Sequence, residues 1–400
     1  MKHILIYLFS LAILASCSRS EWDGPTVDER RQTSVYVSYE QPKIAPGIVI
    51  TDEADDDNAA IIIDKFEEDD LLYFSQQTSI SAPNFTDLDN TDHPLYVYRY
   101  NGKNADWSEG FNFEYTANDK IFDWDMVARI GSVGNAFSLF AFYFPTNKVI
   151  EPKPSECFRV ESDQRGTTDP YDKSNFIKSD IMGAYHATSA LYTRMRFRLF
   201  HLMVYLKVTV YIPVYEEAES KDSYSGFKEG ALQDAFVMNA NTHFTIEWQA
   251  NRSSDTEAPL VQATGDKERI TMYRHKPDET KIIEDFEVKN YYTGGVLTTD
   301  KVRAYTFSVL FPNQQFKDNF LCFQLEAPNK ETMKYYYFAS SQLPDGVDNS
   351  IYGLTQGTLQ ELHLYLPRTT NETVLVGANI LPWFDAGTDM TVTKEQESKD

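Results

Sequence analysis

Apolar and polar residues alternate along short segments over most of the chain. Thr33–Tyr39 reads TSVYVSY, with Val35 and Val37 on one side, and Leu95–Tyr100 reads LYVYRY before an Asn-Gly turn. A period of two residues is typical of β-strands, and Asn-Gly is a common hairpin turn. Ala136–Phe144 is continuously apolar and stops at a proline, as expected of a buried strand. Because no segment of a dozen residues holds a helical period, the pattern predicts an all-β protein.

The longest apolar segment after the first 17 residues is Met195–Tyr215. Its alternation changes face near Leu199 and Phe200, which predicts one strand with a β-bulge at that point. Its charged side chains exclude a membrane span. His201 has no second His or Cys at a metal-ligand spacing, so we expect it to make a structural hydrogen bond. The remaining short strands are expected at Phe111–Tyr115, Ile121–Ile130, Thr242–Trp248, Arg269–Tyr273, Val302–Phe311, Phe320–Leu325, Met333–Phe338, Leu359–Leu366 and Thr373–Val376.

The N-terminus carries an export signal. Lys2 is followed by the uncharged apolar run Ile4–Ser16, which has the length of a signal-peptide core and is too short to span a bilayer. The run ends Leu-Ala-Ser-Cys at Cys17, which resembles a bacterial lipobox. We therefore expect residues 1–16 to be removed and Cys17 to carry the lipid, which anchors a protein firmly when several acyl chains are present. The alternative is a plain secretory signal that happens to contain a cysteine.

Residues 17–32 are polar and include a run of charged residues, so they are expected to form a tether between the lipid and the first strand. The whole chain has 60 acidic and 37 basic residues, a net charge of −23. Such a charge repels phosphate backbones, which excludes nucleic acid as a partner class. The 25 Tyr and 26 Phe fit a β-rich chain. Cys157 and Cys322 could pair in an oxidising compartment, or could be two buried thiols.

No catalytic, metal or cofactor site is predicted. The chain lacks a glycine-rich phosphate loop and the HExxH, CxxC and GxSxG motifs. The acidic run Asp52–Asn58 lacks the glycine and ligand spacing of a calcium loop, so a solvated loop is expected. Paired carboxylates for glycoside hydrolysis need no local motif, and 60 acidic residues give no basis for choosing two.

Several segments, together with the lipobox and the tether, resemble the fimbrillin-like lipoproteins that build or anchor type V fimbriae. The segments that carry the resemblance are Phe66–Asp69, Tyr115–Trp124, Phe137–Pro145, Ser179–Ala184, Phe197–Val208 and Ile380–Trp383. Each is a loose motif by itself, but they follow the expected order along almost the whole chain. Asp70 departs from the family, which often has a glycine turn at this point.

The resemblance implies two transthyretin-like β-sandwich domains in tandem, residues 33–190 and 191–400. In polymerising members of the family, a trypsin-like protease cuts after an arginine and removes the leader with its first strand. Arg31, or Arg30, lies at the corresponding place before Thr33–Tyr39. Val35 and Val37 would then fill the groove of the uncut precursor. A strand from the next subunit would replace them, as in β-augmentation.

The resemblance also implies a non-enzymatic structural or adhesive subunit of a fimbria, lipid-anchored in the outer membrane. Its partners would be other fimbrial subunits, the membrane and a host or bacterial surface receptor. Two alternatives stay open: an anchor subunit that keeps its lipid uncut, and a surface glycan-binding lipoprotein. The second would use aromatic side chains, for which the candidates are Trp107, Trp124, Trp248 and Trp383. A β-sandwich hydrolase is a third reading.

Overall fold

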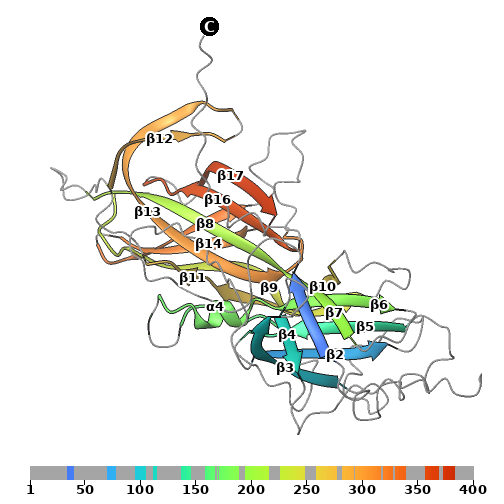
Figure 1. Ribbon diagram of the computed structural model, residues 1–400. Coiled ribbons are helices and arrows are strands. Elements are labelled where there is room, and N and C mark those ends of the chain that lie inside the picture. The colour runs from blue at the N-terminus through green and yellow to red at the C-terminus, as the bar shows by residue number, and fades with distance from the viewer. Residues whose placement is uncertain are drawn as a thin grey trace, which may run out of the picture.

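The structure is a computed structural model of residues 1–400. It describes residues 34–39, 70–77, 95–104, 111–114, 137–145, 158–166, 169, 171–188, 194–215, 226–247, 258–276, 282–291, 293–316, 319–327, 329–338, 356–368 and 373–382. The strands among them form one closed sheet and two open sheets, which lie in two groups (Figure 1). The predicted all-β class is confirmed.

Seven strands from the first half of the chain form the closed sheet, in the order β1-β4-β3-β2-β5-β6-β7. They are β1 (Ser34–Tyr39), β2 (Leu71–Gln77), β3 (Leu95–Asn104), β4 (Phe111–Glu114), β5 (Phe137–Tyr143), β6 (Met182–Thr188) and β7 (Arg194–His201). The strands expected at residues 33–39, 95–100, 111–115 and 136–144 are confirmed. All pairs are antiparallel except β1 with β7, which run parallel and close the sheet.

The second half forms a four-stranded sheet, β10-β9-β14-β15, and a six-stranded sheet, β11-β13-β8-β16-β17, in which β12 also pairs with β13. The strands are β8 (Met203–Pro213), β9 (Leu232–Glu247), β10 (Leu260–Thr271), β11 (Tyr273–Arg274), β12 (Ile282–Lys289), β13 (Val296–Pro312), β14 (Asn319–Glu326), β15 (Thr332–Phe338), β16 (Thr358–Tyr365) and β17 (Val374–Pro382). A short helix, α4 (Ser174–Lys178), precedes β6.

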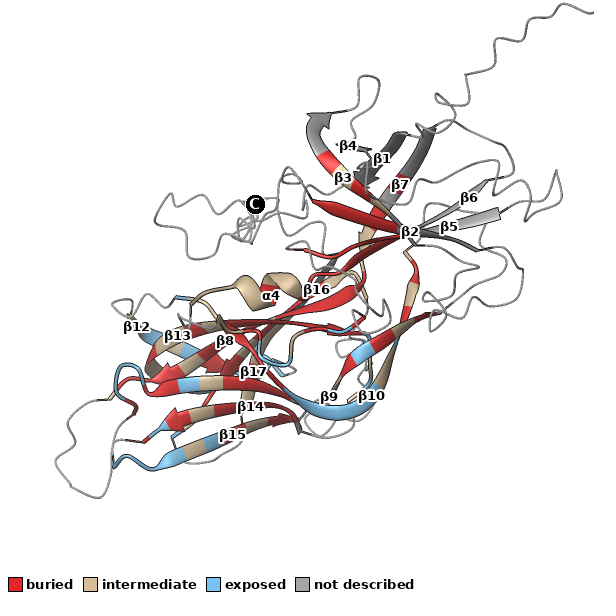
Figure 2. Ribbon diagram, turned by 90° about the horizontal axis from the view of Figure 1, so that it is seen from below, coloured by how far each residue is buried: buried red, intermediate tan, exposed pale blue. Residues whose placement is uncertain are grey.

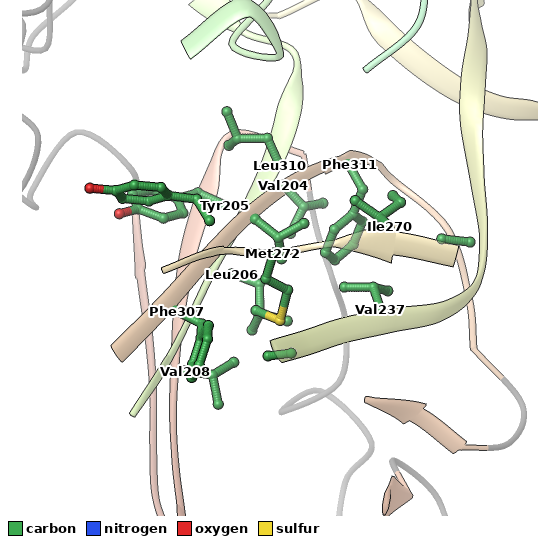
Figure 3. Close-up of a cluster of buried hydrophobic side chains, with 14 of the residues drawn as sticks. Val204, Tyr205, Leu206, Val208, Val237, Ile270, Met272, Phe307, Leu310 and Phe311 are labelled. Atoms are coloured by element: carbon green, nitrogen blue, oxygen red, sulfur yellow. The ribbon is translucent and has the colours of Figure 1, made fainter. Parts of the chain in front are cut away.

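The two open sheets enclose a hydrophobic core. Side chains from β8 and β13 of one sheet meet side chains from β9 and β10 of the other, with Met272 between them (Figure 3). Leu206, Val237 and Ile270 are each fully buried in this layer. Burying one such side chain contributes about 1.5–3 kcal/mol. The alternation read in the sequence therefore places one face of β8 in the core of a sandwich.

Met195–Tyr215 is two strands rather than the single bulged strand that the sequence predicts. β7 belongs to the closed sheet and β8 to the six-stranded sheet, and Leu202 lies between them. The change of face near Leu199 thus marks the passage of the chain from one sheet to another. Leu202 is fully buried, and a Cβ on Gly183 would lie 2.9 Å from its Cδ1 atom. A Cβ at position 183 would therefore require the Leu202 side chain to shift.

The segment 158–166 crosses from the closed sheet onto the sandwich. Phe158 contacts Phe142 and Phe144 of the closed-sheet region and Phe244 of β9, at ring-centroid distances of 5.1, 5.8 and 5.5 Å. All four rings belong to one continuous core. Further along, the fully buried Gln164 donates from Nε2 to the Leu310 carbonyl (2.6 Å) and accepts from the Leu310 N–H (2.9 Å). Its amide thus pairs with β13 as a neighbouring strand would.

A two-stranded arm extends from the six-stranded sheet. It consists of β12, the turn after it and the first residues of β13, and it lies on the side of the sandwich away from the closed sheet (Figure 1). The arm packs back onto the sheet: the Phe286 and Tyr211 rings stack at 4.3 Å, Val288 beside the turn is 1% exposed, and the Tyr291 N–H donates to the Leu375 carbonyl of β17 (3.2 Å). The charged residues of β12 are exposed to solvent (Figure 2).

Candidate assembly site around the first strand

β1 closes the first sheet by pairing on both sides. It runs antiparallel to β4, with Val35 opposite Phe113 and Val37 opposite Phe111. On its other side it runs parallel to β7 over six residue pairs, from Ser34–Arg194 to Tyr39–Leu199. The first strand is therefore internal to a sheet whose closure depends on it. A strand of this kind can leave only if its two neighbours lose their hydrogen-bond partners.

The neighbouring strand β7 is held at its C-terminal end by a buried polar pair. His201 Nδ1 lies 2.8 Å from Asp180 Oδ1, and the two side chains are 11% and 7% exposed. Asp180 lies between α4 and β6, so the pair connects the segment before β6 to the last residue of β7. The structural hydrogen bond expected for His201 is confirmed. In β7 itself, Phe197 and Leu199 are buried.

The chain was compared with known families, curated proteins and solved structures. No family model matches it, and no curated protein matches it. Solved structures do match. A candidate cell adhesion protein from Bacteroides uniformis is 12% identical, with 88% of this chain and 98% of that chain covered, at a TM-score of 0.40.

Two further solved structures carry fimbrial names. The fimbrial anchor protein Mfa2 from Porphyromonas gingivalis is 9% identical, with 88% of this chain and 98% of that chain covered and a TM-score of 0.34. A fimbrial assembly protein from Parabacteroides distasonis is 11% identical, with 87% and 98% covered and a TM-score of 0.32. TM-scores below 0.5 leave the family and the function of this chain to be argued from its own residues.

Most of the predicted site residues lie outside the described part of the chain. These are Cys17, Arg30, Arg31, Cys157 and the four candidate tryptophans, Trp107, Trp124, Trp248 and Trp383. For Val35 and Val37 the structure gives the strand and its register but not the side chains, so their role as a plug stays a prediction. Cys322 is a free, buried thiol whose pKa is raised by burial. That outcome fits the buried-thiol alternative.

A serine–histidine contact in the sandwich was not foreseen from the sequence. Ser308 Oγ lies 2.8 Å from His275 Nε2 and 3.2 Å from the Tyr205 hydroxyl. A serine beside a histidine is the pairing that nucleophilic catalysis uses. Ser308, however, is 0% exposed, so no substrate reaches its hydroxyl. The three residues come from β8, β13 and the segment after β11, and no local motif signals that they meet.

Within the described ranges, no group of three or more His, Cys, Asp or Glu side chains is placed to hold a metal ion. In the same ranges, no helix has the length and apolar character needed to cross a membrane.

Proposed function

We propose that this chain is a non-enzymatic subunit of a cell-surface fimbria, exported as an outer-membrane lipoprotein and assembled by strand exchange at β1. The observation that carries the proposal is the position of β1. It follows a tether that contains Arg30 and Arg31, and it is the strand that closes the first sheet. A cut after either arginine would separate β1 from a lipid on Cys17 without touching the strand itself.

Loss of β1 has a definite physical cost in this fold. It would leave β4 and β7 with unpaired edges, and a buried backbone group without a partner costs about 1–3 kcal/mol. It would also open the sheet beside Phe197 and Leu199, which are buried. A strand of a second subunit that enters the same place restores both kinds of contact. That gain would drive assembly and give a long-lived fibre.

Limited proteolysis of the full-length chain tests the assembly step. Trypsin treatment of the native protein should give a cut at Arg30 or Arg31 and then ladders of heat-resistant multimers on a gel. The triple variant Arg19→Gln/Arg30→Gln/Arg31→Gln, which has no trypsin site between Cys17 and β1, should remain monomeric. Arg19→Gln changes another arginine of the same tether and should behave as wild type. A cut that yields only stable monomer favours an anchor subunit, and a native protein that is never cut there refutes strand exchange at β1.

Acyl labelling tests the lipid anchor separately. Cys17→Ala should abolish incorporation of a clickable fatty acid and leave the protein unprocessed, because the thiol that accepts the diacylglyceryl group is gone. Cys157→Ala serves as the matched control and should keep the label. Labelling that persists in Cys17→Ala would disprove the lipoprotein assignment while leaving the assembly test unaffected.

A further inference from the structure

β1 and β7 are the first and the last strands of the closed sheet in chain order, and they lie side by side. They run parallel through six consecutive residue pairs, from Ser34–Arg194 to Tyr39–Leu199. The chain therefore enters this sheet at one end of the pair, at Ser34, and leaves it at the other end, at His201. A pull on the two chain ends acts along the two strands in opposite directions, so it slides β1 along β7 rather than lifting it away.

Sliding and peeling load the hydrogen bonds of a strand pair differently. In a parallel pair the bonds are evenly spaced along the strands, and sliding puts the force on all of them at the same moment. Peeling from one end breaks the bonds one after another, each under the whole force. β1 also pairs with β4, with Val35 opposite Phe113 and Val37 opposite Phe111. Those bonds run across the strand axis as well, so a slide of β1 has to break both sets together.

The force that leaves this pair passes directly into the sandwich. Leu202 is the single residue between β7 and β8, it is fully buried, and its N–H donates to the Ile181 carbonyl (3.0 Å). β8 lies between β13 and β16, and its pairing with β13 covers all eleven of its residues, from Met203 to Pro213. The arrow of β1 points toward β8 (Figure 1). A pull on the tether therefore acts along β1, with the sandwich as the body that resists it.

The last described strand meets a pull in a different way. β17 runs antiparallel to β16, with Pro382 opposite Thr358, and β16 runs parallel to β8, with Leu359 opposite Tyr205. The C-terminal end of β17 therefore lies at the end of the sandwich where β8 begins. A pull between the tether and Pro382 draws β17 off β16 from that end, one residue pair after another. The fold thus holds its N-terminal side more firmly than its C-terminal side.

We propose that β1 and β7 form a mechanical clamp, which holds the chain against a pull on its N-terminal tether. The clamp gives the uncut chain a further function, which is to carry load from the tether into the sandwich. Its use at a cell surface rests on the proposed function, because a lipid on Cys17 would be the fixed end of the tether. The clamp itself needs neither the lipid nor strand exchange. A cut after Arg31 would disconnect the tether from β1 and end this role.

Optical tweezers test the clamp by pulling the chain in two directions. The full chain, in mild detergent, carries one DNA handle at Ser20 of the tether, attached through an azide-bearing amino acid. The second handle is placed in the same way, either at Lys228 or at Thr193. Lys228 is exposed and follows Phe227, whose N–H donates to the Pro213 carbonyl at the end of β8 (2.8 Å), so this pull slides β1 along β7. Thr193 directly precedes β7, so that pull peels the same pair from its first residues.

At the same loading rate, the first opening should need several-fold more force in the Ser20–Lys228 pull than in the Ser20–Thr193 pull. Forced opening is governed by the rate at which the unfolding barrier is crossed, and sharing the force among all the bonds slows that rate. Equal forces in the two directions would overturn the proposal. Failure of the clamp would leave acyl labelling and the trypsin cut unchanged, so it is distinguishable from failure of the proposed function.

A disulfide across the pair shows which contact opens first. Tyr36 and Arg196 lie opposite each other in the parallel register, so cysteines at these positions should join. In the Ser20–Lys228 pull, oxidised Tyr36→Cys/Arg196→Cys, with Cys157→Ala, should lose the wild-type first opening, and dithiothreitol should restore it. Tyr36→Cys with Cys157→Ala is the matched control and should behave as wild type in both redox states. A first opening that persists in the oxidised variant refutes the clamp, as do two cysteines that fail to join.

Discussion

His275 is a buried residue whose protonation state is controlled by the fold. Burial, together with the nearby Lys207 and Lys173, lowers its pKa to about 3. The neutral ring contacts Ser308 on β13 through Nε2, and its backbone N–H donates to the Thr306 carbonyl. A charged imidazole in this place would be poorly solvated. The residue therefore couples the packing of β13 to pH.

The sign of this coupling predicts acid destabilisation. A histidine of the unfolded chain titrates near pH 6.5, so between about pH 3 and 6.5 the unfolded chain binds one more proton at this site. The free energy of unfolding should therefore fall as the pH drops through that window, by on the order of 1–3 kcal/mol. Urea unfolding at stepped pH values should show a shallower fall in His275→Gln, which cannot titrate.

The control for this experiment is His243→Gln, at an exposed position on β9, which should keep the wild-type slope. Burial also lowers the pKa of His363, so this residue adds to the loss of stability at low pH in every variant. Identical slopes for wild type and His275→Gln would contradict the assignment.

At the scale of the elements, glutamine side chains make the backbone hydrogen bonds that a neighbouring strand would otherwise make. Gln164 pairs with Leu310 of β13, and Gln356 pairs with the start of β10. Gln314 does the same on β9, accepting from the Asn241 N–H (2.8 Å) and donating to its carbonyl (3.0 Å). A primary amide matches the donor and acceptor of one peptide unit. Each glutamine thus satisfies backbone groups where no described strand continues the ladder.

Gln164→Met is predicted to destabilise the sandwich by about 2–4 kcal/mol. The thioether keeps the volume, so the loss arises from the Leu310 N–H and carbonyl, which would be buried without partners at about 1–3 kcal/mol each. Chemical denaturation of the two proteins measures the difference. Gln233→Met, at an exposed position on β9, is the matched control and should change stability little. A Gln164→Met protein as stable as wild type would show that the amide pairing contributes nothing.

Strand positions could be predicted from the sequence better than strand neighbours. The alternation in Thr33–Tyr39 and the apolar run before Pro145 give strands at nearly the observed bounds. The sequence predicts a bulge where the chain passes from β7 to β8 at Leu202, because a change of face gives the same pattern in both cases. β12 was missed because the charges of IIEDFEVK obscure its alternation. Neither the parallel pairing of β1 with β7 nor the glutamine pairs have a local signal, since each joins distant segments.

The candidate site could be predicted only in part. The sequence places a strand directly after Arg31, and the structure gives that strand partners on both sides. The sequence predicts a structural hydrogen bond for His201, but it does not predict that Asp180 is the partner. Their distance in sequence hides the partner, since Asp180 follows α4 and His201 ends β7.

At the scale of the whole molecule, one core joins the two groups of strands. The rings of Phe142 and Phe144 continue through Phe158 to Phe244 of β9. The Phe142–Phe158 and Phe158–Phe244 pairs are edge-to-face, and such pairs contribute about 0.5–1.5 kcal/mol each beyond the area they bury. We therefore expect the closed sheet and the sandwich to unfold together.

Phe158→Ala is predicted to separate their unfolding. The substitution should cost about 3–5 kcal/mol and remove the ring that contacts both groups of strands. Differential scanning calorimetry should then resolve two transitions where the wild type shows one. Phe320→Ala removes a buried ring whose partners, Phe316 and Tyr337, lie within the sandwich, so it should lower stability without splitting the transition. A single transition in Phe158→Ala would contradict the coupling role of Phe158, and two transitions in the wild type would contradict the shared core.

The parallel pairing of β1 with β7 has a consequence for the order of folding. Ser34 pairs with Arg194, so the first strand to emerge during synthesis waits for about 160 further residues before its second neighbour exists. It can join β4 once Phe113 has been made, but the sheet closes only when β7 arrives. Contacts this far apart in sequence form slowly. Among the described strands, β1 is thus made first and is among the last to be enclosed, and any factor that captures it from a nascent chain has that interval in which to act.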